Sequence, residues 1–322
     1  MVKLIRRNKP TLYNTTLTIR DFYQKRNKVL ILRDTGGLGD ILMCRMIFED
    51  FKRIMPEAYV VFAVPERYME AAADHPFVDE VVDSKFVDEN EYTISYNITS
   101  ACGRHETSIA PLADKNRSDI WATHCGIELQ AHNMHLNVDP DLTKECRARM
   151  EQFRTTESGP VVLFCPVSAM VSKNLDAVQM NGVLRGLQER DCLTFGLHKT
   201  KIHELEAPTI EPSNLKQYFA FIHAADYIIT VDTASFHVAG GLRKPTVGVF
   251  SWADGKVYGK WYPNFVLVQR HRDNGNWSCG PCYQWGDCIK CRHQVRKPCI
   301  TEITSDEVLI AAEQMMKKWP LR

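Results

Sequence analysis

Two turns in this sequence carry side chains that could do chemistry. The first follows a short apolar run, 28–33, and contains Gly36, Gly37, Gly39 and Asp40. Glycines let a ligand approach the backbone closely, and a helix that begins after them presents N–H groups to an anion. Asp40 is then either a helix N-terminal cap, which the sequence alone favours, or a general base that accepts a proton from an attacking hydroxyl.

The second turn follows the apolar run 227–231. Its polar and small residues are Asp232, Thr233, Ala234, Ser235 and, one helical turn on, His237. Backbone N–H groups and hydroxyls at such a strand–helix junction can bind a phosphate. The alternative is capping by Asp232 and a histidine whose partners lie in the core.

A third polar segment follows the apolar run 161–164 and contains Ser168 and Lys173. A lysine in a loop is usually solvated. Here it would lie at the same sheet edge as Asp232, where it could neutralise a leaving diphosphate.

The eleven cysteines divide into six scattered residues, interpreted as buried thiols, and a cluster of five: Cys279, Cys282, Cys288, Cys291 and Cys299. Two C-x-x-C pairs and one further thiol are typical of a metal site, so we expect four of the five to hold a structural zinc or iron. The alternative is a set of free thiols on a loop. Residues 251–300 also contain eight Lys and Arg against three Asp, interleaved with tryptophan and tyrosine. Such a run is usually solvated surface, but it could bind a phosphorylated or nucleic-acid acceptor.

The elements that must position these residues follow an alternating pattern. In the first half, strands are predicted at 28–33, 59–64 and 78–82, with a helix of single apolar stripe at 41–55. The pattern restarts after a polar linker at 155–160, with strands at 161–164, 192–195, 227–231 and 246–250 and helices between them. Strands that alternate with helices predict parallel sheets, hence two doubly wound α/β domains facing each other across a cleft.

Composition supports an ordinary globular protein of two domains. The 322 residues are 44% hydrophobic and 25% charged, with 40 Lys and Arg against 39 Asp and Glu. This balance excludes a disordered chain and a globally basic nucleic-acid binder. We find no transmembrane segment and expect a cytoplasmic protein.

Three stretches resemble glycosyltransferase family 9, the ADP-heptose:lipopolysaccharide heptosyltransferase group. They are the turn at Gly39 and Asp40 with segments 55–58 and 75–81, the run 215–250, and Lys173. The resemblance implies the GT-B fold, two Rossmann-like domains facing across a cleft, here with a Cys-rich metal-binding insertion. We expect an acceptor-binding domain at 1–157, a nucleotide-sugar domain at 158–304 with the Cys-rich segment 276–300, and a terminal helix at 305–322.

The resemblance also implies an inverting transfer in which Asp40 deprotonates the acceptor hydroxyl. Lys173, with the segment from Asp232 to His237, would hold the donor, and no catalytic divalent metal is expected. The acceptor could be a glycan, a protein or a modified base in DNA, and a homo-oligomer is compatible with the family.

A non-catalytic metal-ribbon protein that binds nucleic acid is the alternative of a different class. A nicotinamide oxidoreductase is disfavoured, because no acidic residue ends the strand 59–64.

Overall fold

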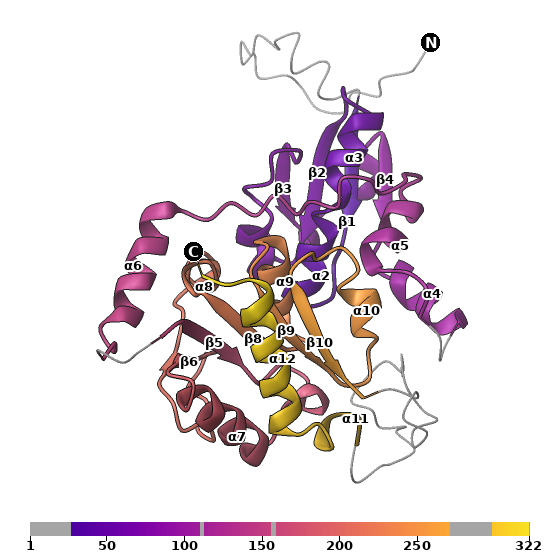
Figure 1. The fold of residues 1–322 in the computed structure, drawn as a ribbon. Coiled ribbons are helices and arrows are strands. Elements are labelled where there is room, and N and C mark those ends of the chain that lie inside the picture. Colours follow the sequence, from indigo (N-terminus) through magenta and orange to yellow (C-terminus); the bar gives the residue numbers. More distant parts are fainter. Residues whose placement is uncertain (1–26, 110–112, 156–158, 271–297, 322) are drawn as a thin grey trace, which may run out of the picture.

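The chain folds around two separate parallel sheets with helices packed against them (Figure 1). The computed structural model describes residues 27–109, 113–155, 159–270 and 298–321. No helix among these residues is long and apolar enough to cross a membrane.

The first sheet has the strand order β3-β2-β1-β4 within the described residues. Its unit contains, in chain order, β1 (Lys28–Leu32), α2 (Leu38–Cys44), α3 (Ile47–Ile54), β2 (Tyr59–Val64), the 3₁₀ helix η1 (Glu66–Ala71), β3 (Glu80–Asp83), the 3₁₀ helices η2 (Ser84–Phe86) and η3 (Glu89–Glu91), β4 (Ile94–Asn97), α4 (Ala101–Ile109) and α5 (Arg117–His124).

The second sheet has the order β10-β9-β8-β5-β6-β7. Its unit contains β5 (Val161–Cys165), the 3₁₀ helix η4 (Val171–Lys173), α7 (Ala177–Gln188), β6 (Leu193–Leu197), β7 (Thr209–Ile210), α8 (Leu215–Ala224), β8 (Tyr227–Val231), α9 (Ala234–Gly241), β9 (Thr246–Phe250), α10 (Gly255–Tyr258), β10 (Phe265–Gln269), α11 (Pro298–Thr301) and α12 (Ser305–Lys318).

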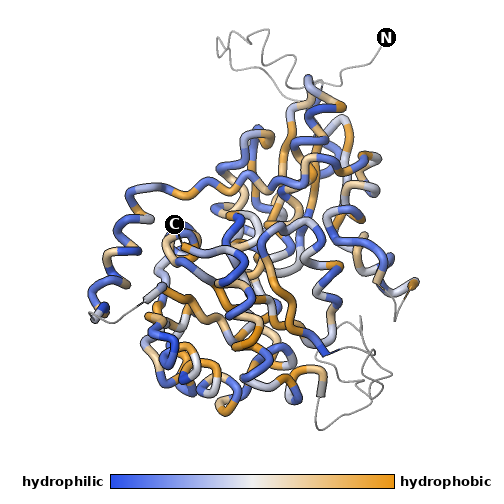
Figure 2. The backbone as a smooth tube through the Cα atoms, in the orientation of Figure 1, coloured by the Kyte–Doolittle hydropathy of each residue, from blue (hydrophilic) through white to orange (hydrophobic). Residues whose placement is uncertain are grey.

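The central strands are continuous apolar runs because both faces of each sheet are covered. Every residue of β5 and β8 is buried, as are all but the first residues of β1 and β2. Figure 2 shows these strands as mostly hydrophobic segments inside the molecule. In both sheets the first strand pairs with the second and the fourth, so each has a switch point where loops leave in opposite directions. Ligands of α/β proteins bind in the crevice at such a point.

The single helix predicted at 41–55 is wrong, because the chain breaks between α2 and α3 at Arg45 and Met46. The Arg45 side chain is fully buried and donates hydrogen bonds to the carbonyl oxygens of Met134 (2.7 Å) and His135 (2.6 Å). It also pairs with Asp74 at 2.7 Å. A buried guanidinium needs such acceptors. Arg45, at the break, therefore holds the segment around Met134 and His135, which leads to the second unit.

Two helices at the unit limits pack on the second unit. α6 (Pro140–Glu151) lies before residue 157 but packs against α8. Arg147 of α6 donates to Ala224 O at 3.0 Å and pairs with Asp226 at 2.9 Å. α12 lies against α7, β9 and β10 (Figure 1). The domain limits stay predictions.

Candidate active site

The two turns singled out in the sequence line one cavity between the sheets, with a volume of about 860 Å³. Loops after β1, β5 and β8 form its walls, and both Asp40 and Asp232 contribute to them. Ser168, Lys173, Thr233, Ala234, Ser235 and His237 line the same cavity, as do Gly37 and Gly39. The structure therefore brings together most of the residues that the sequence suggested from two distant turns, whereas Gly36 is not among the residues that line the cavity.

Asp40 is not the N-cap residue but the third residue of α2. The N-cap is Gly37, whose backbone N–H donates to Asp40 Oδ2 at 3.0 Å. The helix begins earlier than predicted because Leu38 and Gly39 already adopt helical geometry. One oxygen of the Asp40 carboxylate thus accepts a hydrogen bond from the backbone at the start of the helix, and the residue still lines the cavity. The capping and the chemical interpretations are therefore compatible.

Two arginines determine the charge of Asp40. Arg117 Nη1 lies 2.7 Å from Oδ1, and Arg33 Nη2 lies 3.7 Å from Oδ2. Burial alone would raise the pKa of this carboxyl, but the arginines and the Gly37 hydrogen bond outweigh it and lower the pKa to about 2. Asp40 is therefore ionised at neutral pH.

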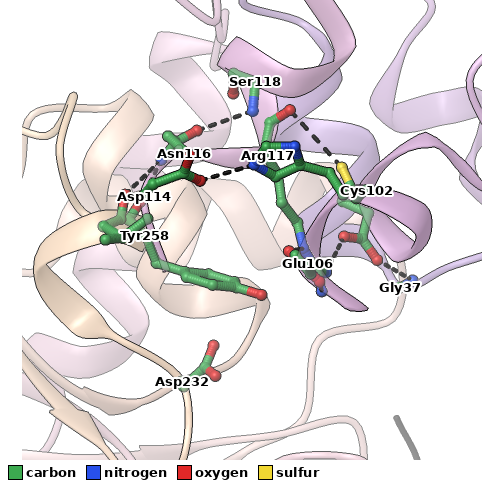
Figure 3. A network of polar contacts seen from close by, with 12 residues as sticks. Gly37, Cys102, Glu106, Asp114, Asn116, Arg117, Ser118, Asp232 and Tyr258 are labelled. Atoms are coloured by element: carbon green, nitrogen blue, oxygen red, sulfur yellow. Dashed lines mark hydrogen bonds and ion pairs between the residues drawn. The ribbon is translucent and has the colours of Figure 1, made fainter. Parts of the chain in front are cut away.

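Arg117 is itself held by Glu106, at 2.7 Å and 3.0 Å from Nε and Nη2 (Figure 3). Both side chains line the cavity, and both are nearly buried. Sequence reasoning missed them because α4, which carries Glu106, has no clear apolar periodicity. The one available signal was Asn116, an N-cap residue type that precedes Arg117.

Gly36 and Gly39 each exclude a side chain for a different physical reason, whereas Gly37 does not. Gly36 has a φ of +111°, and a Cβ there would lie 2.7 Å from Asp40 Oδ2. Gly39 has ordinary backbone geometry, but a Cβ there would lie 2.6 Å from His237 Cδ2 of α9. Gly39 therefore allows α2 and α9, which belong to opposite units, to touch. A Cβ at Gly37 would meet no atom within 4 Å.

On the opposite wall, Asp232 at the end of β8 pairs with Lys173, whose Nζ lies 2.7 Å from Oδ2. Both side chains are nearly buried, with 4% and 15% exposed, so the pair is poorly screened by water. The same ammonium group lies 4.8 Å from the centre of the Trp252 ring. Sequence reasoning foresaw the lysine and the aspartate but not the tryptophan.

The N-terminus of α9 meets the cavity next to this pair. Thr233 is the N-cap residue, and Ala234 and Ser235 form the first turn, where backbone N–H groups attract an anion. Ser235 Oγ is 2.6 Å from the hydroxyl of Tyr218, which comes from α8. Ser168 lies in the loop before η4, and its hydroxyl donates to Met170 O at 2.9 Å.

His237 is a neutral donor or acceptor at this site. Burial lowers its pKa to about 4, although the nearby carboxylates Asp232 and Asp40 act in the opposite direction. Its Nδ1 is 2.7 Å from the Tyr262 hydroxyl, which fixes the ring.

The predicted metal ligands Cys279, Cys282, Cys288 and Cys291 lie outside the described residues. Cys299 lies in α11, is half-buried and packs against the core. Within the part of the chain that the structure describes, no three His, Cys, Asp or Glu side chains gather in a way that could hold a metal ion. The zinc or iron site stays a prediction.

The fold resembles solved glycosyltransferases. The family 9 glycosyltransferase of Veillonella parvula superposes with a TM-score of 0.69 at 13% identity, over 91% of this chain and 98% of the other. E. coli ADP-heptose LPS heptosyltransferase II gives a TM-score of 0.64 at 13% identity, over 90% and 99%. The iron-containing dodecameric glycosyltransferase TibC of enterotoxigenic E. coli gives 0.69 at 13% identity, over 91% and 79%.

These likenesses concern the fold, whereas membership of a family follows from the sequence. No curated protein sequence matches the chain. The sequence profile described as glycosyltransferase family 9 (heptosyltransferase) matches residues 115–279, which is more than half of the chain and includes Lys173 and the turn from Asp232 to His237. The protein belongs to glycosyltransferase family 9 and is a glycosyltransferase enzyme.

Proposed function

We propose that the protein transfers a sugar from a nucleotide-sugar donor to an acceptor hydroxyl with inversion at the anomeric carbon. The observation that carries this proposal is that an ionised carboxylate, Asp40, shares one cavity with Lys173 and the N-terminus of α9. A solved relative, TibC, is described in complex with ADP-D-beta-D-heptose. A nucleotide sugar is accordingly the donor class that we assign to this cavity.

In this mechanism the acceptor oxygen attacks the anomeric carbon while the bond to the donor's diphosphate breaks. Asp40 accepts the hydroxyl proton, and a carboxylate of low pKa does so late, after bond formation has made that proton acidic. Lys173 and the first turn of α9 stabilise the charge that develops on the departing diphosphate. Because these groups supply positive charge from the protein, the proposal requires no divalent metal in the transfer step.

The acceptor binds on the wall formed by the first unit. Besides Asp40, this wall carries Arg67, Tyr68 and Glu70 from η1, which are polar groups suited to a hydroxylated acceptor. A glycan, a protein side chain and a modified DNA base all present such a hydroxyl.

A structural zinc or iron at the cysteine cluster is a separate part of the proposal. C-x-x-C pairs can hold either metal, and TibC is described as iron-containing. The metal would stabilise the segment that contains the cysteines and take no part in the transfer.

The experiment that tests the function is mass spectrometry of products after incubation with a panel of nucleotide sugars and candidate acceptors. Asp40→Asn should lower kcat by about 10²–10⁴-fold, the usual contribution of a general base. Because this substitution leaves the opposite wall intact, thermal stabilisation of the variant by ADP, UDP or GDP should match that of the wild type. Unchanged transfer by Asp40→Asn would refute the assignment of the base.

A further inference from the structure

Asn116 joins the two units directly beside the proposed base. Its side chain is 1% exposed. The amide nitrogen donates to the carbonyl oxygens of Val257 and Tyr258, both at 2.9 Å, at the end of α10 in the second unit. Its amide oxygen accepts from the backbone N–H of Ser118 at 2.9 Å and so caps α5 in the first unit. One buried side chain therefore satisfies a helix end in each unit (Figure 3).

The next residue along the chain, Arg117, contacts both the second unit and Asp40. Arg117 is the first residue of α5, and its guanidinium lies 5.1 Å from the centre of the Tyr258 ring and 2.7 Å from Asp40 Oδ1. Tyr258 thus touches Asn116 through its carbonyl oxygen and Arg117 through its ring. Arg117 therefore contacts the second unit directly through the Tyr258 ring and indirectly through its neighbour Asn116.

Other charged and titratable groups also surround Asp40. Arg33 approaches from the end of β1, His237 from α9, Glu106 from α4 through Arg117, and the thiols Cys44 and Cys102 from α2 and α4. Arg33 and Cys44 belong to the same unit as Asp40, and burial raises the pKa of both thiols, which keeps them neutral. Arg117 is held by Glu106 within its own unit and also contacts the opposite unit through the Tyr258 ring.

We propose that Asn116 is a positioning residue that couples the orientation of the Asp40 carboxylate to the contact between the two units. While its amide is bonded to Val257 and Tyr258, α5 holds Arg117 against Asp40. When the units move apart, that pairing loosens. This inference rests on the proposed function, in which Asp40 is the base.

Asn116→Ser is the variant that isolates this role. Serine caps a helix as well as asparagine does, but it is too short to reach the carbonyl oxygens of α10. Lys260→Met is the matched control, because Lys260 pairs with Asp119 across the same interface at 3.1 Å without contacting the base network. An exposed pair of this kind contributes little.

For Asn116→Ser we expect a fall in kcat of about 10–100-fold, the effect of a displacement of roughly 1 Å at a reacting group. The donor KM should stay within about twofold, since Asn116 does not line the cavity. With Arg117 displaced, Asp40 loses one of the groups that lower its pKa while Arg33 and the Gly37 hydrogen bond remain, so its pKa should rise and the acidic limb of the activity profile should move to higher pH. Lys260→Met should leave both kcat and this limb unchanged.

A second readout needs no substrate. The titration of Asp40 can be followed by ¹³C NMR of protein labelled at aspartate carboxyls, with the signal assigned from Asp40→Asn. An upward shift of the Asp40 titration in Asn116→Ser supports the proposed coupling, whether or not the wild type turns over a donor. A wild type that turns over no donor would contradict the proposed function and leave the titration result unaffected. An unshifted titration, or an equal shift in Lys260→Met, overturns the coupling. If Asn116→Ser fails to fold, Asn116→Thr, which also keeps a cap residue, is measured in its place.

Discussion

Replacing Gly39 with alanine tests the contact between the two units at its tightest point. The added Cβ would lie 2.6 Å from Cδ2 and 3.1 Å from Nε2 of His237, whereas ordinary contact begins at 3.4 Å. The ring cannot retreat easily, because Tyr262 holds its Nδ1 at 2.7 Å and Phe236 packs beside it. Separation of α2 from α9 by several tenths of an ångström is therefore the expected response.

Two effects of this substitution oppose each other. Alanine in a helix is more favourable than glycine by about 0.5–1 kcal/mol. Overpacking a filled contact costs about 1–3 kcal/mol. Overpacking should win, since the nearest atom belongs to a held, buried ring, and we expect a net loss of about 1–2 kcal/mol in the free energy of unfolding.

Thermal unfolding measures this loss, at about 1.5 °C of Tm for each kcal/mol in a protein of 322 residues. Gly37→Ala is the control, because its Cβ would meet no atom within 4 Å. The double variant Gly39→Ala/His237→Ala should be less destabilised than the sum of the single variants, since the clash is then gone. A Gly39→Ala protein as stable as the wild type, or additive effects in the double variant, would refute the packing argument.

Three further results follow from the site. Lys173→Met should destabilise the protein by about 3–5 kcal/mol, because it leaves the Asp232 carboxylate buried without its cation. Lys173→Met/Asp232→Asn should recover much of that stability in urea unfolding without recovering donor binding by calorimetry. The pKa of Asp40 is lowered from 3.8 to about 2, so its ionised form contributes about 2 kcal/mol of stability above pH 4 that is lost as the pH falls toward 2. The stability gap between wild type and Asp40→Asn should hence shrink as the pH falls from 4 toward 2, and a gap independent of pH would contradict this. Elemental analysis of purified protein should find close to one equivalent of zinc plus iron per chain, and less than half an equivalent would argue against the cysteine site.

Sequence patterns predicted the parts of the fold that depend on local composition. The strands Tyr59–Val64, Tyr227–Val231 and Thr246–Phe250 are found with the predicted bounds, because each is an apolar run between turn residues. The terminal helix expected within 305–322 is found at Ser305–Lys318, with acidic residues in its first turn and lysines in its last. The meeting of Asp40 and Asp232 in one cavity also followed, since both residues lie at the carboxyl edge of a parallel sheet.

What could not be predicted depends on contacts distant in sequence. Arg45, at the break between α2 and α3, donates hydrogen bonds to carbonyl oxygens 89 and 90 residues away. Arg117 reaches Asp40 across 77 residues, and Asn116 reaches α10 across more than 140. Such pairs leave no local periodicity in the sequence, so the partners that tune the proposed base emerge only from the three-dimensional arrangement.

The packing of α6 on α8 has a practical consequence for dividing the molecule. A fragment ending near residue 157 would keep α6 but lose the second unit, against which α6 and its buried residues Cys146 and Met150 pack. Arg147 would also lose its two acceptors, Ala224 and Asp226. Recombinant expression of the halves should instead cut ahead of Pro140, so that α6 stays with α8, the helix it packs against. The isolated first unit would then not expose the packing face of α6 to solvent. The two purified pieces could be mixed to test whether the enzyme reassembles.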